Sequence, residues 1–272
     1  MRAALLGLFG WLIVAMPAPA APPAAWERTF AELLAVYVRP DGVRYAAWRG
    51  NPGDIARLVE VCDAIGRARL PAGDPDRIAF YINAYNAWVL RQVVTAPRLA
   101  GVRELAPEFG FFTRPTIRVA GEVGSLDHLE KGILLREYPD LRIHFAINCA
   151  SRSCPPLLAA PYRADQIEAQ LDAAAAGFIN DPVRGVALAP GGVRVSKIFE
   201  WYRPEFESAG GITTFINRFR REPLPVGTAI GFLEYDWSLN DAGAPVADGQ
   251  AAPAEASGKR IEKSEPNPTP GS

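Results

Sequence analysis

The chain contains few residues of the kinds that most often carry chemistry. Its 272 residues include two histidines, three cysteines and two methionines. No Cys/His pairs with zinc-finger spacing, P-loop, dinucleotide fingerprint or GxSxG elbow occur. Lys and Arg total 29 against 30 for Asp and Glu, without long runs of either sign. We therefore expect no metal, no cofactor and no nucleic-acid partner.

Long apolar runs are missing after the first twenty residues. Within those twenty, Arg2 precedes an apolar stretch over residues 3–16, and Ala18-Pro19-Ala20 offers a small-x-small cleavage site. This pattern predicts a signal peptide over residues 1–20. An uncleaved anchor is the alternative, but the run is shorter than the ~20 residues that cross a bilayer. We expect an exported protein, periplasmic or extracellular, with no stable membrane span after cleavage.

Composition predicts one folded domain over residues 21–240. Hydrophobic residues make up 49% of the chain, which is enough for a large core. Residues 241–272 consist mainly of Ala, Pro, Gly, Ser, Glu and Lys without periodicity, which predicts a disordered tail. Apolar spacing and turn residues predict helices over 26–38, 54–68, 74–96, 126–138, 165–179, 198–206 and 212–219, hairpins over 115–125 and 186–197, and strands over 141–148 and 228–237. The fold class is mixed α/β (α+β), with a central apolar helix on a small mixed sheet and helices at the periphery.

The helix predicted over residues 74–96 is apolar nearly all round, so it belongs at the centre of the core. Asn83 and Asn86 are three residues apart and lie on one strip of this helix. Two interpretations remain open. The amides either form a structural network that ties the helix to loop backbone, or they line a substrate pocket.

The segment HFAINCASRSCPPL, residues 144–157, concentrates reactive side chains. Its apolar start predicts a strand that breaks at Cys149, and such a loop at a sheet edge is a common place for a site. Cys149 is a functional thiol, an inert thiol or the partner of Cys154 in a disulfide. Zinc held by His144, Cys149 and Cys154 is a fourth interpretation. Cys62, on the apolar stripe of a predicted helix, is expected to be a buried inert thiol.

A cysteine nucleophile needs its thiolate stabilised, usually by a histidine. His144 is close to Cys149 in sequence, but in an extended strand the two meet only if the chain doubles back. His128, on the preceding helix, is the second candidate. Asn148, Ser151 and Ser153 would shape the loop or donate hydrogen bonds to a bound oxyanion. A group of aromatic residues either packs in the hydrophobic core or forms a binding surface for a sugar or peptide. The group consists of Trp201, Tyr202, Phe206, Tyr235 and Trp237.

Four strings in fixed order resemble the DUF547 family, a domain of unknown function, and a fifth fits as well. They are FYINAYNAWVL (80–90), SLDHLEKGIL (125–134), HFAINCASRSCPPL (144–157), VSKIFEWYRPEF (195–206) and the closing YDWSLN (235–240). The resemblance spans residues 41–240 and implies a single mixed α/β domain, while the family name records no activity. Two positions depart from the pattern, because Glu205 stands where an aspartate is expected and Lys131 where a histidine often follows the glutamate matched by Glu130.

Three functions from different classes follow. The first is a cysteine-dependent hydrolase or transferase of the cell envelope, with Cys149 as nucleophile, His144 or His128 as base, and Asn83, Asn86, Asn148, Ser151 and Ser153 around a small-molecule or peptide substrate. The second is a non-catalytic envelope binding or scaffold module with a structural Cys149 to Cys154 loop. The third is a thiol-disulfide protein, although C-x4-C is not the usual C-x-x-C spacing. The sequence alone does not decide whether the protein is an enzyme.

Overall fold

The computed structural model describes residues 24–96, 99–106 and 108–243. Within them the α-helices are α1 (Ala25–Tyr37), α2 (Tyr45–Arg49), α3 (Pro52–Arg67), α4 (Asp74–Thr95), α5 (Gly110–Thr113), α6 (Leu135–Glu137), α7 (Ile167–Ile179), α8 (Ile198–Trp201), α9 (Arg203–Ser208) and α10 (Ile212–Phe219). Three short 3-10 helices are η1 (Val102–Glu104), η3 (Leu141–Phe145) and η4 (Ala164–Gln166), and η2 (His128–Leu134) is a π-helix. The strands are β1 (Val38–Arg39), β2 (Gly42–Val43), β3 (Ile117–Val119), β4 (Glu122–Gly124), β5 (Val186–Ala189), β6 (Gly192–Val195) and β7 (Ala229–Phe232).

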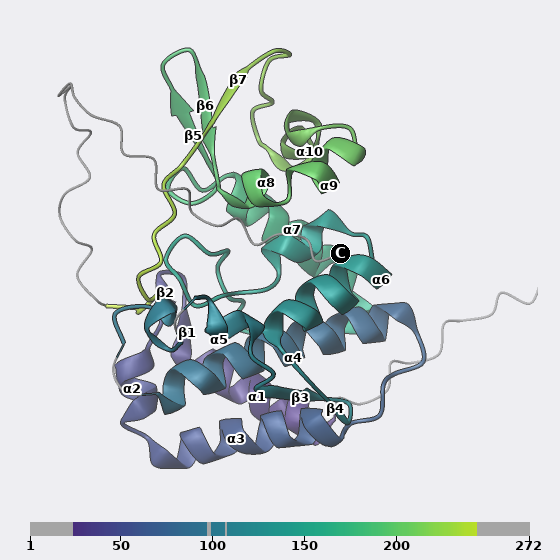
Figure 1. The fold of residues 1–272 in the computed structure, drawn as a ribbon, viewed down its shortest axis with the longest axis vertical. Coiled ribbons are helices and arrows are strands. Elements are labelled where there is room, and N and C mark those ends of the chain that lie inside the picture. The colour runs from purple at the N-terminus through teal and green to yellow at the C-terminus, as the bar shows by residue number, and fades with distance from the viewer. Residues whose placement is uncertain (1–23, 97–98, 107, 244–272) are drawn as a thin grey trace, which may run out of the picture.

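Helix α4 lies at the centre of the larger of two hydrophobic cores. Every residue from 79 to 90 is buried, so the helix has no solvent-facing side over three turns. Helices α1, α2 and α3 pack below it and η2 beside it (Figure 1). The central apolar helix is therefore confirmed, and its polar side chains Asn83 and Asn86 are buried with it.

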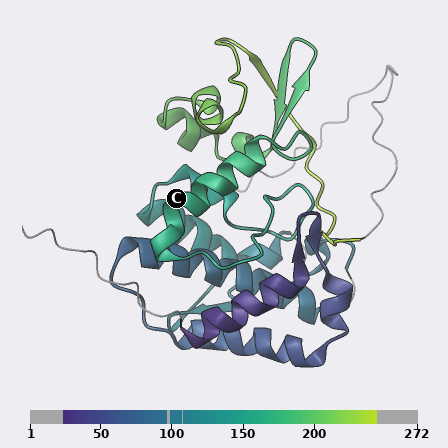
Figure 2. The same ribbon diagram turned by 180° about the vertical axis from the view of Figure 1, so that it is seen from behind.

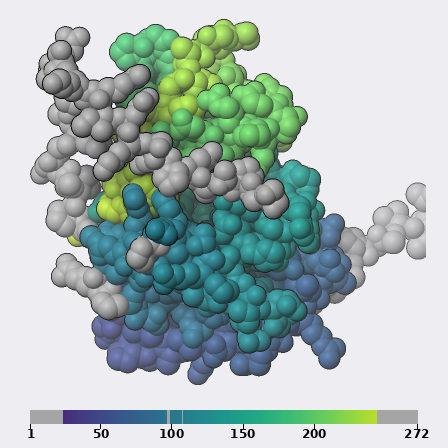
Figure 3. Space-filling model, viewed as in Figure 1, coloured from purple at the N-terminus to yellow at the C-terminus, as the bar shows by residue number. Residues whose placement is uncertain are grey.

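A second core lies above the first. It is built from α7 to α10 and from the sheet β5-β6-β7, in which β6 pairs antiparallel with β5 and parallel with β7. Figure 2 shows this upper part from behind, with α7 between it and the helices below. The small mixed sheet predicted from the sequence thus exists, but it packs with α7 to α10. In the space-filling view the green residues of the second core occupy the upper part of the molecule and the purple and blue residues of α1 to α3 the lower part (Figure 3).

The longer helices and both hairpins predicted from the sequence are confirmed, with ends shifted by a few residues. The helix predicted over 198–206 is split into α8 and α9, and α2 was not predicted. Ser125 begins the 126–137 helix as expected, because its hydroxyl oxygen accepts the backbone N–H of His128 at 3.1 Å. The predicted signal peptide, residues 1–20, lies outside the described residues. So does the predicted tail from residue 244 onward.

The strand predicted over residues 141–148 is wrong. Asp140 accepts the backbone N–H of Arg142 at 2.9 Å and starts the 3-10 helix η3, which is followed by a loop. Residues 143–148 are all buried, because Phe145 enters the second core while Ile143 and Ile147 enter the first. A short, largely apolar segment of this length fits a buried strand and a buried helical turn equally well. His144, Ala146 and Asn148 consequently do not share a strand face.

A closing segment, residues 233–242, joins the two cores. It leaves β7 and runs down to the β1-β2 hairpin, as both ribbon views show (Figures 1 and 2). Along this path it forms isolated bridges from Ser238 to Gly101, from Leu239 to Ser151 and from Asp241 to Val43. Backbone hydrogen bonds continue to Ala242, whose N–H donates to Val43 at 2.9 Å.

Candidate functional site

The cysteine loop, residues 149–154, is held closed by one buried asparagine. The Asn148 carboxamide accepts the N–H of Ala150 at 2.8 Å and donates to the carbonyl oxygen of Pro155 at 2.6 Å. Ala150 adopts the left-handed conformation, with φ of 63°, which turns the chain sharply after Cys149. The two ends of the loop therefore meet, and Cys149 comes to lie beside Cys154.

The sulfur of Cys149 is surrounded by hydrogen-bonding groups. Its Sγ lies 3.0 Å from the Ser151 hydroxyl and 3.3 Å from the Tyr235 hydroxyl, and these two hydroxyls are 3.1 Å apart. The backbone N–H of Cys149 donates to Cys154 Sγ at 2.8 Å. Cys149 is half-buried, whereas Cys154 is only 5% exposed. All three cysteines are free thiols in this structure.

These contacts separate the acidities of the two thiols. Burial raises the pKa of Cys149, but hydrogen bonds from Cys154, Ser151 and Tyr235 outweigh burial and lower the pKa from 9.0 to about 7. Burial, and then the hydrogen bond to Cys149 and its charge, raise the pKa of Cys154 well above the ordinary value. Cys149 is therefore the thiol that ionises first as the pH rises, while Cys154 keeps its proton.

Neither histidine hydrogen-bonds to Cys149. His144 is buried, and its Nε2 lies 2.8 Å from Glu205 Oε2, with the ring 4.1 Å from that of Tyr202. His128 is exposed on η2 and lies against Gly132. The Cys-His contact considered from the sequence is not formed, and the partners of the Cys149 sulfur are two hydroxyls and a thiol. A catalytic role for either histidine stays a prediction.

The side-chain amides of Asn83 and Asn86 form hydrogen bonds with backbone groups. Asn83 donates to the carbonyl of Tyr162 and accepts its N–H, both at 2.8 Å. Asn86 donates to the carbonyl of Ala146 at 3.0 Å and accepts the N–H of Asn148 at 2.9 Å. These bonds agree with the structural network proposed from the sequence, and Asn86 positions the residue that precedes Cys149.

Of the two candidate serines, Ser151 contacts the Cys149 sulfur and Ser153 does not. Ser153 holds the closing segment, because its hydroxyl oxygen accepts the N–H of Asp236 at 2.8 Å. Tyr235 and Asp236 are thereby fixed over the cysteine loop. The sequence places Tyr235 among possible core aromatics, since nothing local in the chain shows that it returns to a cysteine 86 residues away.

A second polar cluster surrounds Glu130 on η2. Its carboxylate accepts the Tyr202 hydroxyl at 2.5 Å and the Tyr85 hydroxyl at 3.3 Å. Burial raises the pKa of Glu130, while the Tyr202 hydrogen bond and the nearby His144 lower it in part. Burial is the main cause that raises the pKa of Tyr85, and the charges of Glu130 and Cys149 raise it further. The two clusters therefore both act on one buried residue of α4, Tyr85.

Aromatic rings border the Cys149 side of the site. Tyr235 lies 4.7 Å from Trp201 and 4.6 Å from Trp237, measured between ring centroids. All three rings are half-buried, whereas Phe206 is fully buried in the second core. The aromatic set considered from the sequence thus divides into the core residue Phe206, a partly exposed group beside the thiol, and Tyr202, which lies on His144 and Glu130.

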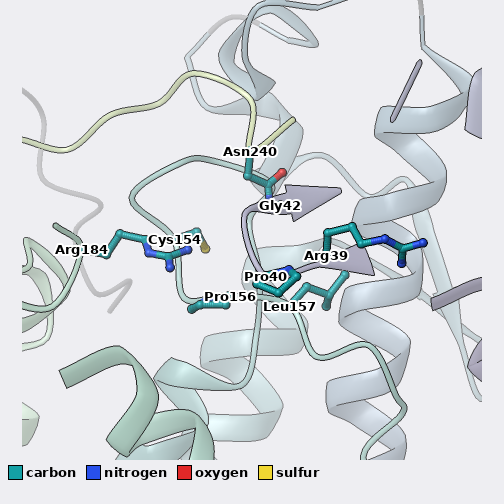
Figure 4. A pocket seen from close by; sticks show the side chains of 8 residues that line it. All are labelled: Arg39, Pro40, Gly42, Cys154, Pro156, Leu157, Arg184 and Asn240. Atoms are coloured by element: carbon teal, nitrogen blue, oxygen red, sulfur yellow. The ribbon is translucent and has the colours of Figure 1, made fainter. Parts of the chain in front are cut away.

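Of two cavities in the described part of the chain, one borders the cysteine loop and the other lies away from it. One, between the cysteine loop and the β1-β2 hairpin, has a volume of about 10 Å³, roughly that of one water. Figure 4 shows Cys154 and Asn240 in its wall, with the Arg39 side chain extending away from Cys154. The other, of about 580 Å³, lies between α3, α4 and the β3-β4 hairpin, and none of its lining residues contacts Cys149.

Comparison with known families identifies part of the chain. Residues 72–179 match the family described as "Protein of unknown function, DUF547". Over these residues the chain is similar to the DUF547 family. No curated protein and no solved structure matches the chain. The DUF547 match contains Glu130, His144 and the whole cysteine loop, but it ends before the Tyr235 and Glu205 that bond to them.

In residues 24–96, 99–106 and 108–243, no helix is both long and apolar enough to cross a bilayer. Over the same ranges no group of three or more His, Cys, Asp or Glu side chains is arranged to hold a metal ion.

Proposed function

We propose that this protein is a cysteine-dependent hydrolase or transferase of the cell envelope, with Cys149 as its nucleophile. The observation that carries the proposal is the half-buried Cys149 sulfur with the hydroxyls of Ser151 and Tyr235 on it. A buried inert thiol would have apolar neighbours instead. The envelope location rests on the signal peptide predicted over residues 1–20.

The chemistry follows from the protonation states. The Cys149 thiolate attacks a carbonyl carbon of the substrate, and the bond to the leaving group breaks to give a thioester. Burial, and then the charges of Cys149 and Cys154, raise the pKa of Tyr235 well above the ordinary value, so its hydroxyl stays protonated and can donate to the developing oxyanion. Water or a second substrate then takes the acyl group. His144 and His128 remain the candidates for the base of that second step.

The pH dependence of alkylation tests the nucleophile. The rate constant for iodoacetamide at Cys149 should reach half its maximum near pH 7 rather than at the free-cysteine pKa of about 8.5. Tyr235→Phe and Ser151→Ala each remove a donor to the thiolate, so the midpoint should move to higher pH. Tyr202→Phe removes a neighbouring phenol that does not contact Cys149, and it should leave the midpoint unchanged. A wild-type midpoint at or above 8.5 contradicts the proposal.

An ester substrate tests the acyl step. With p-nitrophenyl acetate we expect a burst of one p-nitrophenolate per protein and an acetyl group on residues 143–152, found by mass spectrometry after trypsin digestion. Cys149→Ser should abolish both. Cys62, whose pKa burial raises to about 12, serves as the internal control and should stay unmodified in the native protein.

One observation favours the non-catalytic alternative, a binding or scaffold module. The closing segment makes backbone bonds all along the cysteine loop, from Ser153 to Asp236, Arg152 to Ser238 and Asn240 to Ala150. Such bonding would suit a purely structural loop. The scaffold function is favoured by two results together. Cys149→Ser keeps the melting temperature of the wild type, and the wild type shows the alkylation midpoint and the burst of free cysteine.

A further inference from the structure

Cys154 is the part of the site that acyl transfer does not use. Its thiol hydrogen-bonds to Cys149, and its sulfur also accepts the Cys149 backbone N–H at 2.8 Å. Four residues separate the two cysteines, and Asn148 bonds to both flanks of the loop, at Ala150 and Pro155. The loop thus brings a second sulfur against the first.

The two sulfurs are not equivalent. Cys149 is half-buried beside Trp201, Tyr235 and Trp237, where an incoming molecule can reach it. Cys154 is 5% exposed and lines the one-water cavity behind the loop. An accessible attacking sulfur with a buried sulfur behind it is the arrangement that thiol-disulfide exchange requires. Cys62 is fully buried between α3 and α4 and contacts neither.

We propose that Cys149 and Cys154 form a dithiol pair that reduces an accessible disulfide, with Cys149 as the attacking and Cys154 as the resolving sulfur. This second activity rests on the nucleophilic role of Cys149 proposed above. It differs from that role in its electrophile, which is sulfur rather than carbon. A small disulfide such as oxidised glutathione and an exposed disulfide of a protein present the same chemistry to Cys149.

Both steps balance. The Cys149 thiolate attacks one sulfur of R–S–S–R, forms the mixed disulfide Cys149–S–S–R and releases R–S⁻. That thiolate takes the proton of Cys154 and leaves as R–SH. The Cys154 sulfur then attacks Cys149 Sγ, breaks its bond to the second R–S group and releases R–S⁻. The substrate disulfide gains two electrons, the pair becomes the Cys149–Cys154 disulfide, and an external dithiol returns it to the reduced state.

The sequence offers a direct assay of this pair. Trypsin cuts after Arg152, so Cys149 and Cys154 fall in separate peptides, residues 143–152 and 153–163, while Cys62 falls in residues 58–67. Reduced protein is treated with oxidised glutathione and quenched with acid and N-ethylmaleimide. It is then digested with trypsin, and the peptide masses are measured by mass spectrometry. We expect the two peptides linked to each other, with glutathione on residues 143–152 as a transient.

Two variants assign the roles of the sulfurs. Cys154→Ser should accumulate a stable glutathione adduct on Cys149, because the resolving sulfur is gone. Cys149→Ser should form any adduct on Cys154 at least ten-fold more slowly. Insulin reduction with dithiothreitol as the external dithiol forms the second arm, and turnover on insulin but not on glutathione would identify a protein disulfide as the substrate.

The failures are distinguishable. If Cys149 reacts with iodoacetamide near pH 7 but the wild type keeps a glutathione adduct and never links the two peptides, the dithiol proposal fails while the nucleophile proposal stands. If Cys149 does not react at all, both fail. A linked pair that native protein retains in excess dithiothreitol shows a structural disulfide and also overturns the dithiol proposal.

Discussion

Several asparagine side chains form the hydrogen bonds that a neighbouring backbone segment would otherwise make to irregular backbone. Asn83 pairs with both polar groups of Tyr162, and Asn217 does the same with Leu224 through bonds of 3.0 and 2.8 Å. Asn86 links Ala146 to Asn148. Each carboxamide presents one donor and one acceptor in the spacing of a peptide group, so irregular backbone is satisfied without a neighbouring strand.

Removing these amides should destabilise the protein. Asn83→Leu and Asn86→Leu each leave a buried carbonyl and a buried N–H without a hydrogen-bond partner. We therefore expect the free energy of unfolding to fall by about 1 to 3 kcal/mol for each variant. Thr95→Leu, at an exposed position of the same helix, should change it by less than about 0.5 kcal/mol. Urea denaturation measures all three. Stability unchanged in both asparagine variants would instead support a pocket.

Glu130 should make stability depend on pH. Burial raises its pKa, so the folded chain binds a proton more readily than the unfolded chain. Its contribution is therefore fully present below the unfolded glutamate pKa of about 4.3 and is lost as the pH rises through the folded value. Relative to wild type, Glu130→Gln should be more stable at about pH 8 than at about pH 5 in urea denaturation. The exposed Glu222→Gln is the control, and a Glu130→Gln difference that does not change with pH contradicts this prediction.

The sequence points to the cysteine loop but not to its partners. Two cysteines and two serines within six residues are visible in any reading of the chain. Tyr235 and the Tyr202 that binds Glu130 lie 86 and 72 residues from the groups they contact, and no local pattern encodes such a distance. His144 shows the opposite limit, because it is close to Cys149 along the chain and yet its ring nitrogen contacts Glu205.

At the scale of elements, length decided which predictions were right. Helices α1, α3 and α4 repeat their apolar pattern over 13 to 22 residues, which only a helix explains. Residues 141–148 are too few to show a period, and they divide their side chains between two cores. The π-helix η2 was also beyond prediction, since it differs from an α-helix by its hydrogen-bond spacing and not by its apolar face.

The β3-β4 hairpin carries backbone strain that a substitution can relieve. Val119 pairs with Glu122, which leaves Ala120 and Gly121 as a two-residue turn with φ of 51° and 92°. Asparagine tolerates this left-handed conformation better than alanine. Ala120→Asn should therefore raise the free energy of unfolding by about 0.5 to 1 kcal/mol. Thermal unfolding tests this, with Ala120→Val, which is β-branched and should lower stability, as the opposite control.

At the scale of the molecule, the closing segment sets where the folded part can be cut. Deleting residues 244–272 should leave the melting temperature unchanged, because that stretch has no apolar periodicity to bury. Deleting residues 233–272 removes the bridges to Gly101, Ser151 and Val43 and should lower the melting temperature by well over a few degrees. Calorimetry of the two truncations decides this. A large loss from the shorter deletion alone would place folded structure beyond Gly243.

The route of the closing segment also fixes when the thiol site can exist. A chain made from its N-terminus completes both cysteines some 80 residues before Tyr235, and Asn240 must return across 195 residues to receive the Tyr45 hydroxyl. Contacts between such distant residues form slowly and late in folding. A nascent chain therefore lacks the Tyr235 hydrogen bond to Cys149 through most of its synthesis, and the set of three side-chain donors to this sulfur is complete only when the last residues of the fold arrive.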